Sequence, residues 1–118
     1  MKILVPVDFE PQSLIAMEQS YNLARLLPAE IVLLFVYDAP AGIRSLFGAN
    51  HDEEILKKLE DELAGLASAV MTETGLQVST MIETGRIYTK ILQTADKIGA
   101  QLIIMGTHSQ PELPEKTT

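Results

Sequence analysis

The chain has 118 residues, and its 16 acidic and 9 basic side chains give a formal net charge of −7. This length suits one domain that buries roughly two-thirds of the surface its unfolded chain exposes. Cysteine is absent, which excludes disulfides and thiolate metal sites, and an acidic chain without a Lys/Arg cluster is a poor partner for duplex nucleic acid. With no signal-peptide pattern or long apolar run, we expect a soluble cytoplasmic protein.

The first predicted strand, residues 2–9, reads KILVPVDF and contains three β-branched side chains. A helix is expected to begin at Glu10 and Pro11, where the missing proline N–H costs nothing, and to end at Pro28. Its apolar side chains recur every three or four residues and predict one face against a sheet. These side chains are Leu14, Met17, Tyr21, Ala24 and Leu27.

Residues 30–38, EIVLLFVYD, predict a second strand whose continuous apolar run suits the centre of a parallel sheet. The next segment, residues 39–51, contains glycine and proline and is expected to be a loop. It carries a small apolar group, Ile43, Leu46 and Phe47, which we interpret as a satellite of the core, a lid or a dimer contact.

Residues 52–74 predict the longest helix, which Gly75 ends as a left-handed cap. Its expected inward face comprises Ile55, Leu59, Leu63, Leu66 and Val70. Residues 76–83 alternate between apolar and more polar side chains, as suits a strand at a sheet edge. After a turn at Gly85, a third helix is expected to end at Gly99. Its expected inward face comprises Ile87, Ile91, Ala95 and Ile98.

Residues 102–105 predict a final strand, apolar enough to be buried on both faces of a parallel sheet, and Gly106 is expected to permit a turn after it. The order βαβαβαβ predicts a doubly wound, open parallel α/β sheet with helices on both faces. Ligands of such sheets bind beyond the carboxyl ends of the strands, so Asp8 and Gly106 face one crevice if the first and fourth strands are neighbours. The domain is expected to cover residues 1–109, followed by a disordered tail at 110–118.

Three short motifs resemble those of the universal stress protein family, in matching order across nearly all residues up to Ser109. They are VPVDF near the start, LLFVYD in the second strand and LIIMGTHS in the fourth. The resemblance implies a sheet with strand order 3-2-1-4-5, in which the first and fourth strands are adjacent. The fifth strand is absent from this sequence, which leaves the order 3-2-1-4.

The nucleotide-binding branch of that family holds ATP in this crevice, and the resemblance implies which residues of this chain would line it. On the adenosine side it places Pro6, Val7 and Asp8, with the Asp8 carboxylate positioned for a ribose hydroxyl or a nearby polar group. Val36 would meet the adenine through its backbone. The wall that leads to the phosphates would begin with Met105, Gly106, Thr107 and His108. The implied ligand is ATP or AMP, with Mg²⁺ accompanying a triphosphate.

The family's glycine-rich phosphate motif is only partly present. Gly106 matches its first glycine, Ser109 stands at the second, and the sequence ends before the final glycine and hydroxyl pair. Each hydrogen bond to a charged phosphate contributes about 1.5–3 kcal/mol, so the loss of two or three predicts triphosphate binding weaker by more than about a hundredfold. The adenosine-side contacts are unaffected.

Structural interpretations of the same residues stay open. Asp8 also suits an N-cap, Gly106 a simple turn, and His108 an exposed loop. No cluster of metal ligands accompanies either histidine, so no metal site is predicted. Neither a nucleophile elbow nor a GK[ST] phosphate loop occurs, so we expect binding rather than catalysis, with slow ATP hydrolysis left open.

The predicted function is that of a regulatory domain in stress response, in which nucleotide occupancy orders the loops of the crevice. One alternative is a nucleotide-independent dimerisation or interaction module of the same family. It follows from the apolar edge at residues 102–105, which would be exposed without a fifth strand and so predicts a homodimer or another partner. A phospho-acceptor receiver domain fits less well, because residues 83–85 supply a glutamate where that domain needs an aspartate.

Overall fold

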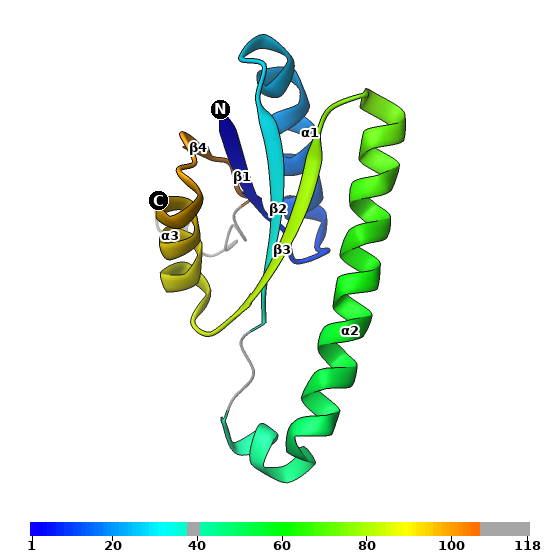
Figure 1. Ribbon diagram of the computed structural model, residues 1–118, viewed down its shortest axis with the longest axis vertical. Coiled ribbons are helices and arrows are strands. Elements are labelled where there is room, and N and C mark those ends of the chain that lie inside the picture. Colours follow the sequence, from blue (N-terminus) through cyan, green and yellow to red (C-terminus); the bar gives the residue numbers. More distant parts are fainter. Residues whose placement is uncertain (38–40, 107–118) are drawn as a thin grey trace, which may run out of the picture.

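The computed structural model describes residues 1–37 and 41–106, with side chains for residues 1–37 and 53–106. Strands and helices alternate along the chain: β1 (Lys2–Pro6), α1 (Pro11–Leu26), β2 (Glu30–Tyr37), α2 (Ala41–Thr74), β3 (Val78–Thr84), α3 (Ile87–Ile98) and β4 (Leu102–Ile103). The strands pair in parallel in the order β3-β2-β1-β4 (Figure 1). This confirms the predicted doubly wound α/β sheet and the adjacency of the first and fourth strands.

The sheet buries apolar side chains on both faces. Ile3, Val5 and Val7 of the β1 segment join a core cluster with side chains of α1 and α2. Leu4 points the opposite way and packs with Ile91 of α3. Alternate residues of β1 and β2 therefore enter different cores, which explains why both strands read as continuous apolar runs. Two helices cover the first face and α3 covers the second.

Helix α1 packs against the sheet through smaller side chains than predicted. The predicted positions Met17 and Ala24 are buried, whereas Leu14 and Tyr21 only partly join the core. Ser13 and Ser20 are buried in addition. The Ser20 hydroxyl donates a hydrogen bond to the Met17 carbonyl, so burial leaves it with a partner. Small side chains let the helix approach the sheet closely, and a search for large apolar residues overlooks them.

Helix α2 begins at Ala41, so the predicted loop over residues 39–51 is wrong. The glycines at 42 and 48 suggested a loop, but each costs a helix only about 1 kcal/mol. Ile43, Leu46 and Phe47 keep the helical spacing, although their side chains lie outside the described residues. In the part of the chain that the structure describes, no helix is long and apolar enough to cross a membrane.

The first and last strands are shorter than predicted. β1 ends at Pro6 rather than at residue 9, although the Val7 N–H still donates to the Leu34 carbonyl at 2.9 Å. β4 contains only Leu102 and Ile103, each 37% exposed, so the expected burial on both faces is wrong. The reason is that β4 pairs with β1 on one side only and forms the edge of the described sheet. The opposite edge is β3, as predicted.

Candidate functional site

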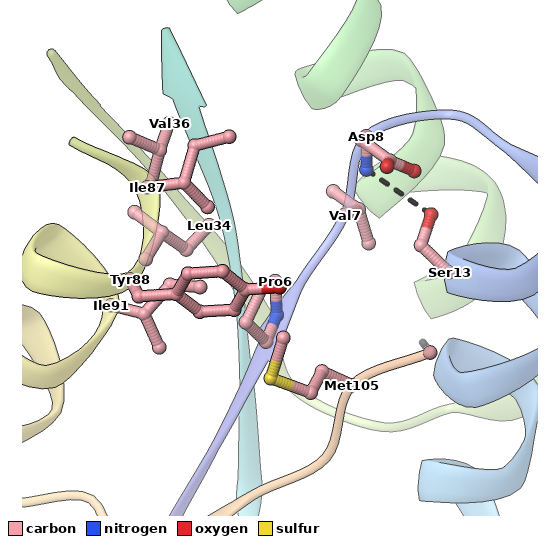
Figure 2. A pocket seen from close by; sticks show the side chains of 11 residues that line it. Pro6, Val7, Asp8, Ser13, Leu34, Val36, Ile87, Tyr88, Ile91 and Met105 are labelled. Carbon is pink, nitrogen blue, oxygen red and sulfur yellow. Dashed lines mark hydrogen bonds between the residues drawn. The ribbon is translucent and has the colours of Figure 1, made fainter. Parts of the chain in front are cut away.

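A cavity of about 150 Å³ opens at the carboxyl ends of β1 and β2, between α3 and the start of α1 (Figure 2). Six of the predicted site residues line it: Pro6, Val7, Asp8, Val36, Met105 and Gly106. They come from three segments far apart in the sequence, which the order of the strands brings together. The predicted residues Thr107 and His108, and Ser109 beside them, lie outside the described residues. The nucleotide-binding role of all eight predicted residues stays a prediction.

Asp8 begins a tight turn that leads from β1 into α1. Its carboxylate Oδ1 accepts a hydrogen bond from the Glu10 N–H at 2.9 Å, and its own N–H donates to the Ser13 hydroxyl at 3.1 Å. The N-cap residue of α1 is Glu10, whose side chain makes no capping bond. Asp8 therefore closes the turn ahead of the helix, and the N-cap position itself belongs to Glu10.

Phe9, the central residue of this turn, has a φ of 64°, which is unusual for a bulky side chain. Its ring packs against the ring of Phe35 from β2, with 5.6 Å between the centroids and 35° between the planes. The hydrogen bonds of Asp8 and this ring pair hold the turn in place from both sides. The Asp8 side chain is thereby fixed at the rim of the cavity.

Gly106 is required for space rather than for its turn. Its φ lies outside the left-handed region, which corrects the expectation that its backbone conformation demanded glycine. A Cβ built on it would collide with the backbone carbonyl of Gln12 and lie 2.8 Å from the backbone nitrogen of Ser13. The segment after β4 thus passes directly over the first turn of α1 and closes one end of the cavity.

The other lining residues were not predicted as site residues: Ser13, Leu34, Ile87, Tyr88 and Ile91. Three of them belong to α3, which follows β3 in the chain and crosses back over β1 and β2. The spacing of Ile87 and Ile91 indicated one helix face, but Ile91 is buried and Ile87 is 45% exposed at the mouth of the cavity. Ile91 therefore belongs both to the core and to the cavity lining, whereas Ile87 lines the cavity only at its mouth.

The chemistry of the described lining is that of an apolar slot with few polar groups. Asp8 provides its carboxylate, and Ser13 and Tyr88 provide hydroxyls, whereas the described lining contains no lysine or arginine. The Ser13 hydroxyl already donates to the Glu10 carbonyl at 3.1 Å. Residues 1–37 and 53–106 contain no group of three or more His, Cys, Asp or Glu side chains that could hold a metal ion. The arrangement suits binding of a flat, mostly apolar group.

Comparison with known proteins identifies one family. A sequence model described as "Universal stress protein family" matches residues 1–115. The chain is 29% identical over 108 residues to universal stress protein MJ0531 of Methanocaldococcus jannaschii, covering 90% of this chain and 64% of that protein. It therefore spans less than two thirds of that relative's length. It is also 29% identical over 130 residues to MJ0577 of the same organism, covering 97% of this chain and 80% of MJ0577.

Solved structures share the fold. The structure of MJ0577 superposes with a TM-score of 0.71 at 30% identity, covering 97% of this chain and 79% of that chain. A universal stress protein in complex with cAMP gives a TM-score of 0.65 at 14% identity, covering 98% and 82%. A family member from Arabidopsis thaliana with AMP bound gives 0.53 at 18% identity, covering 91% and 76%. At these identities the last two likenesses show the fold alone.

Proposed function

Because this chain belongs to the universal stress protein family, we propose that its crevice binds an adenine nucleotide weakly and that the bound nucleotide regulates the protein in a cytoplasmic stress response. The observation that carries the proposal is the meeting of Pro6, Val36 and Gly106, from three separate segments, on one cavity. That cavity lies at the carboxyl ends of the strands, beside the junction of β1 and β4 where the strand order reverses.

The size and lining of the cavity favour the base as the enclosed part of the ligand. Its volume of about 150 Å³ is below the roughly 300–1,000 Å³ of pockets that enclose a whole drug-sized ligand. Aliphatic walls, among them Leu34 and Val36, suit a flat ring, and Asp8 at the rim suits a ribose hydroxyl. The ribose and phosphates would then extend out of the cavity.

Two structural neighbours support an adenine ring, since one is described with AMP and another with cAMP. The described lining offers no lysine or arginine, and the chain carries a net charge of −7. A triphosphate therefore gains little attraction here, so AMP and ATP are expected to bind with similar, weak affinity. Where ATP binds, Mg²⁺ would accompany its phosphates.

Regulation rather than catalysis fits the polar groups of the crevice. A hydrolase needs a base or a positioned water, and the hydroxyl of Ser13 is committed to the turn at Asp8 and Glu10. Nucleotide binding would instead stabilise that turn and the segment at Gly106, changing the surface presented to a partner. Slow ATP hydrolysis would appear as phosphate release in a stopped assay and is the measurable alternative.

A second candidate function is a nucleotide-independent module for self-association. The observation that favours it is the apolar edge strand, where Leu102 and Ile103 are both partly exposed. A homodimer paired through β4 would cover this edge. Sedimentation at several protein concentrations tests the proposal, and Leu102→Lys is expected to shift a dimer toward monomer. A chain that stays monomeric at high concentration would contradict it.

Calorimetric titration with adenosine, AMP and ATP tests the proposed nucleotide site. Asp8→Ala removes both the turn bond and the contact to ribose, so we expect at least about a tenfold loss of affinity. Asp8→Asn keeps an acceptor oxygen for the Glu10 N–H and should lose less.

Asp96→Asn is the matched control, because it removes one acidic charge from the exposed side of α3, outside the described lining. Equal affinity for AMP in all four proteins would remove Asp8 from the site. No binding to the unsubstituted protein at millimolar nucleotide would refute the proposed function and favour the interaction module.

A further inference from the structure

Tyr88 occupies an unusual position for a large aromatic side chain. It lies in the first turn of α3, lines the cavity and is 70% exposed. Figure 2 shows its ring extending from α3 across the opening, toward Pro6 and Met105. No hydrogen bond to its hydroxyl occurs among the described side chains, and the ring pair found among them joins Phe9 and Phe35 instead. Most of the Tyr88 side chain is therefore accessible from the crevice and from solvent.

The packing of the protein does not account for this ring. Ile91, one turn further along α3, is buried and already anchors the helix in the core. The helix neighbour of Tyr88 at i+4 is Leu92, which is itself 65% exposed. A contact between two exposed side chains of one helix stabilises a fold only slightly. The position of the ring is explained better by the crevice than by the core.

We propose that Tyr88 determines the specificity of the crevice by stacking its ring on a planar, uncharged base. The inference rests on the proposed binding of an adenine nucleotide and names the part of the ligand that is recognised. Stacking on a tyrosine ring needs a flat partner, and Leu34 and Val36 make the lining opposite the solvent largely aliphatic. The absence of lysine and arginine from the described lining favours a neutral ring over a phosphate.

The proposal is tested with Tyr88→Phe and Tyr88→Leu, titrated by calorimetry with AMP and with ribose 5-phosphate. Phenylalanine keeps the aromatic face, so AMP affinity should stay within about twofold of the unsubstituted protein. Leucine keeps an apolar side chain of good helix propensity but has no flat face, so AMP affinity should fall by about 5- to 100-fold. Ribose 5-phosphate has no base and should respond to neither change.

Leu92→Ala is the matched control, because it removes an exposed apolar side chain of the same helix outside the described lining. It should leave AMP affinity unchanged. Proton NMR gives a second readout, since a stacked base shifts the Tyr88 ring resonances upfield.

Three outcomes overturn the inference, and they are distinguishable. If the unsubstituted protein binds AMP and Tyr88→Leu binds it equally well, stacking is refuted while the proposed function stands. If Tyr88→Leu lowers the affinity for AMP and for ribose 5-phosphate alike, the residue shapes the crevice but does not recognise the base. If the unsubstituted protein binds neither AMP nor adenosine, the inference and the proposed function fail together.

Discussion

Replacing Gly106 by alanine should damage both the fold and the crevice. The added Cβ would collide with the backbone of Gln12 and Ser13. The Gln12 carbonyl and the Ser13 nitrogen belong to the backbone of the first turn of α1, where the Ser13 N–H donates to the Glu10 carbonyl at 3.1 Å. Neither group can therefore move aside as a flexible side chain would. Overpacking of this kind costs about 1–3 kcal/mol, and relief requires the segment after β4 to move away from α1.

The unfolding free energy of Gly106→Ala is measured by urea denaturation followed by circular dichroism, and its AMP affinity by calorimetry. Gly65→Ala is the matched control, because Gly65 lies within α2 and a Cβ added there would meet no atom within 4 Å beyond the adjoining backbone of its own helix. Because alanine has a better helix propensity than glycine, this control substitution should stabilise the protein by about 0.5–1 kcal/mol. Equal stability and AMP affinity in Gly106→Ala and the unsubstituted protein would refute the close approach at this position.

Two other substitutions test the turn at Asp8 and the surroundings of Tyr21 in α1. Ser13→Ala removes the acceptor for the Asp8 N–H and should lower the free energy of unfolding by about 1 kcal/mol in urea; an unchanged midpoint would show that the turn holds without it. Burial, with Glu73 and Glu18 nearby, raises the pKa of Tyr21 above its ordinary value of 10.0. Above pH 10.0 the unfolded chain therefore loses this proton first, so stability should fall as pH rises. Tyr21→Phe should fall less steeply, and parallel curves would contradict the assignment.

The helices and strands were predictable because their residues follow simple periods, whereas the order of the strands came from the family resemblance. β1 and β2 are continuous apolar runs, and parallel strands joined by helices leave few topologies. Gly75 and Gly99 end their helices, as predicted, and both adopt the left-handed conformation, which was predicted for Gly75. The prediction of a loop before residue 52 was wrong because it relied on the glycines of that segment. The spacing of its apolar residues continues that of α2, which begins at Ala41.

The candidate site was predictable on one side only. Asp8 and Gly106 follow strands, so the topology alone directed them to one edge of the sheet. Ser13, Ile87 and Tyr88 lie on helices, and no sequence period says which turn of a crossover helix passes over the ends of the strands. The sequence also could not show why residue 106 is a glycine. Its lack of a side chain leaves room for the backbone of α1, which is nearly a hundred residues away in the chain.

The most direct test of the account is to map AMP onto the protein by following backbone amide resonances during titration. The account predicts that the largest shifts fall at Val7, Asp8, Val36, Tyr88 and Gly106, with small shifts at the amino ends of the strands near Gln77. Shifts spread evenly over the surface, or concentrated away from the carboxyl ends of β1 and β2, would contradict the proposed crevice.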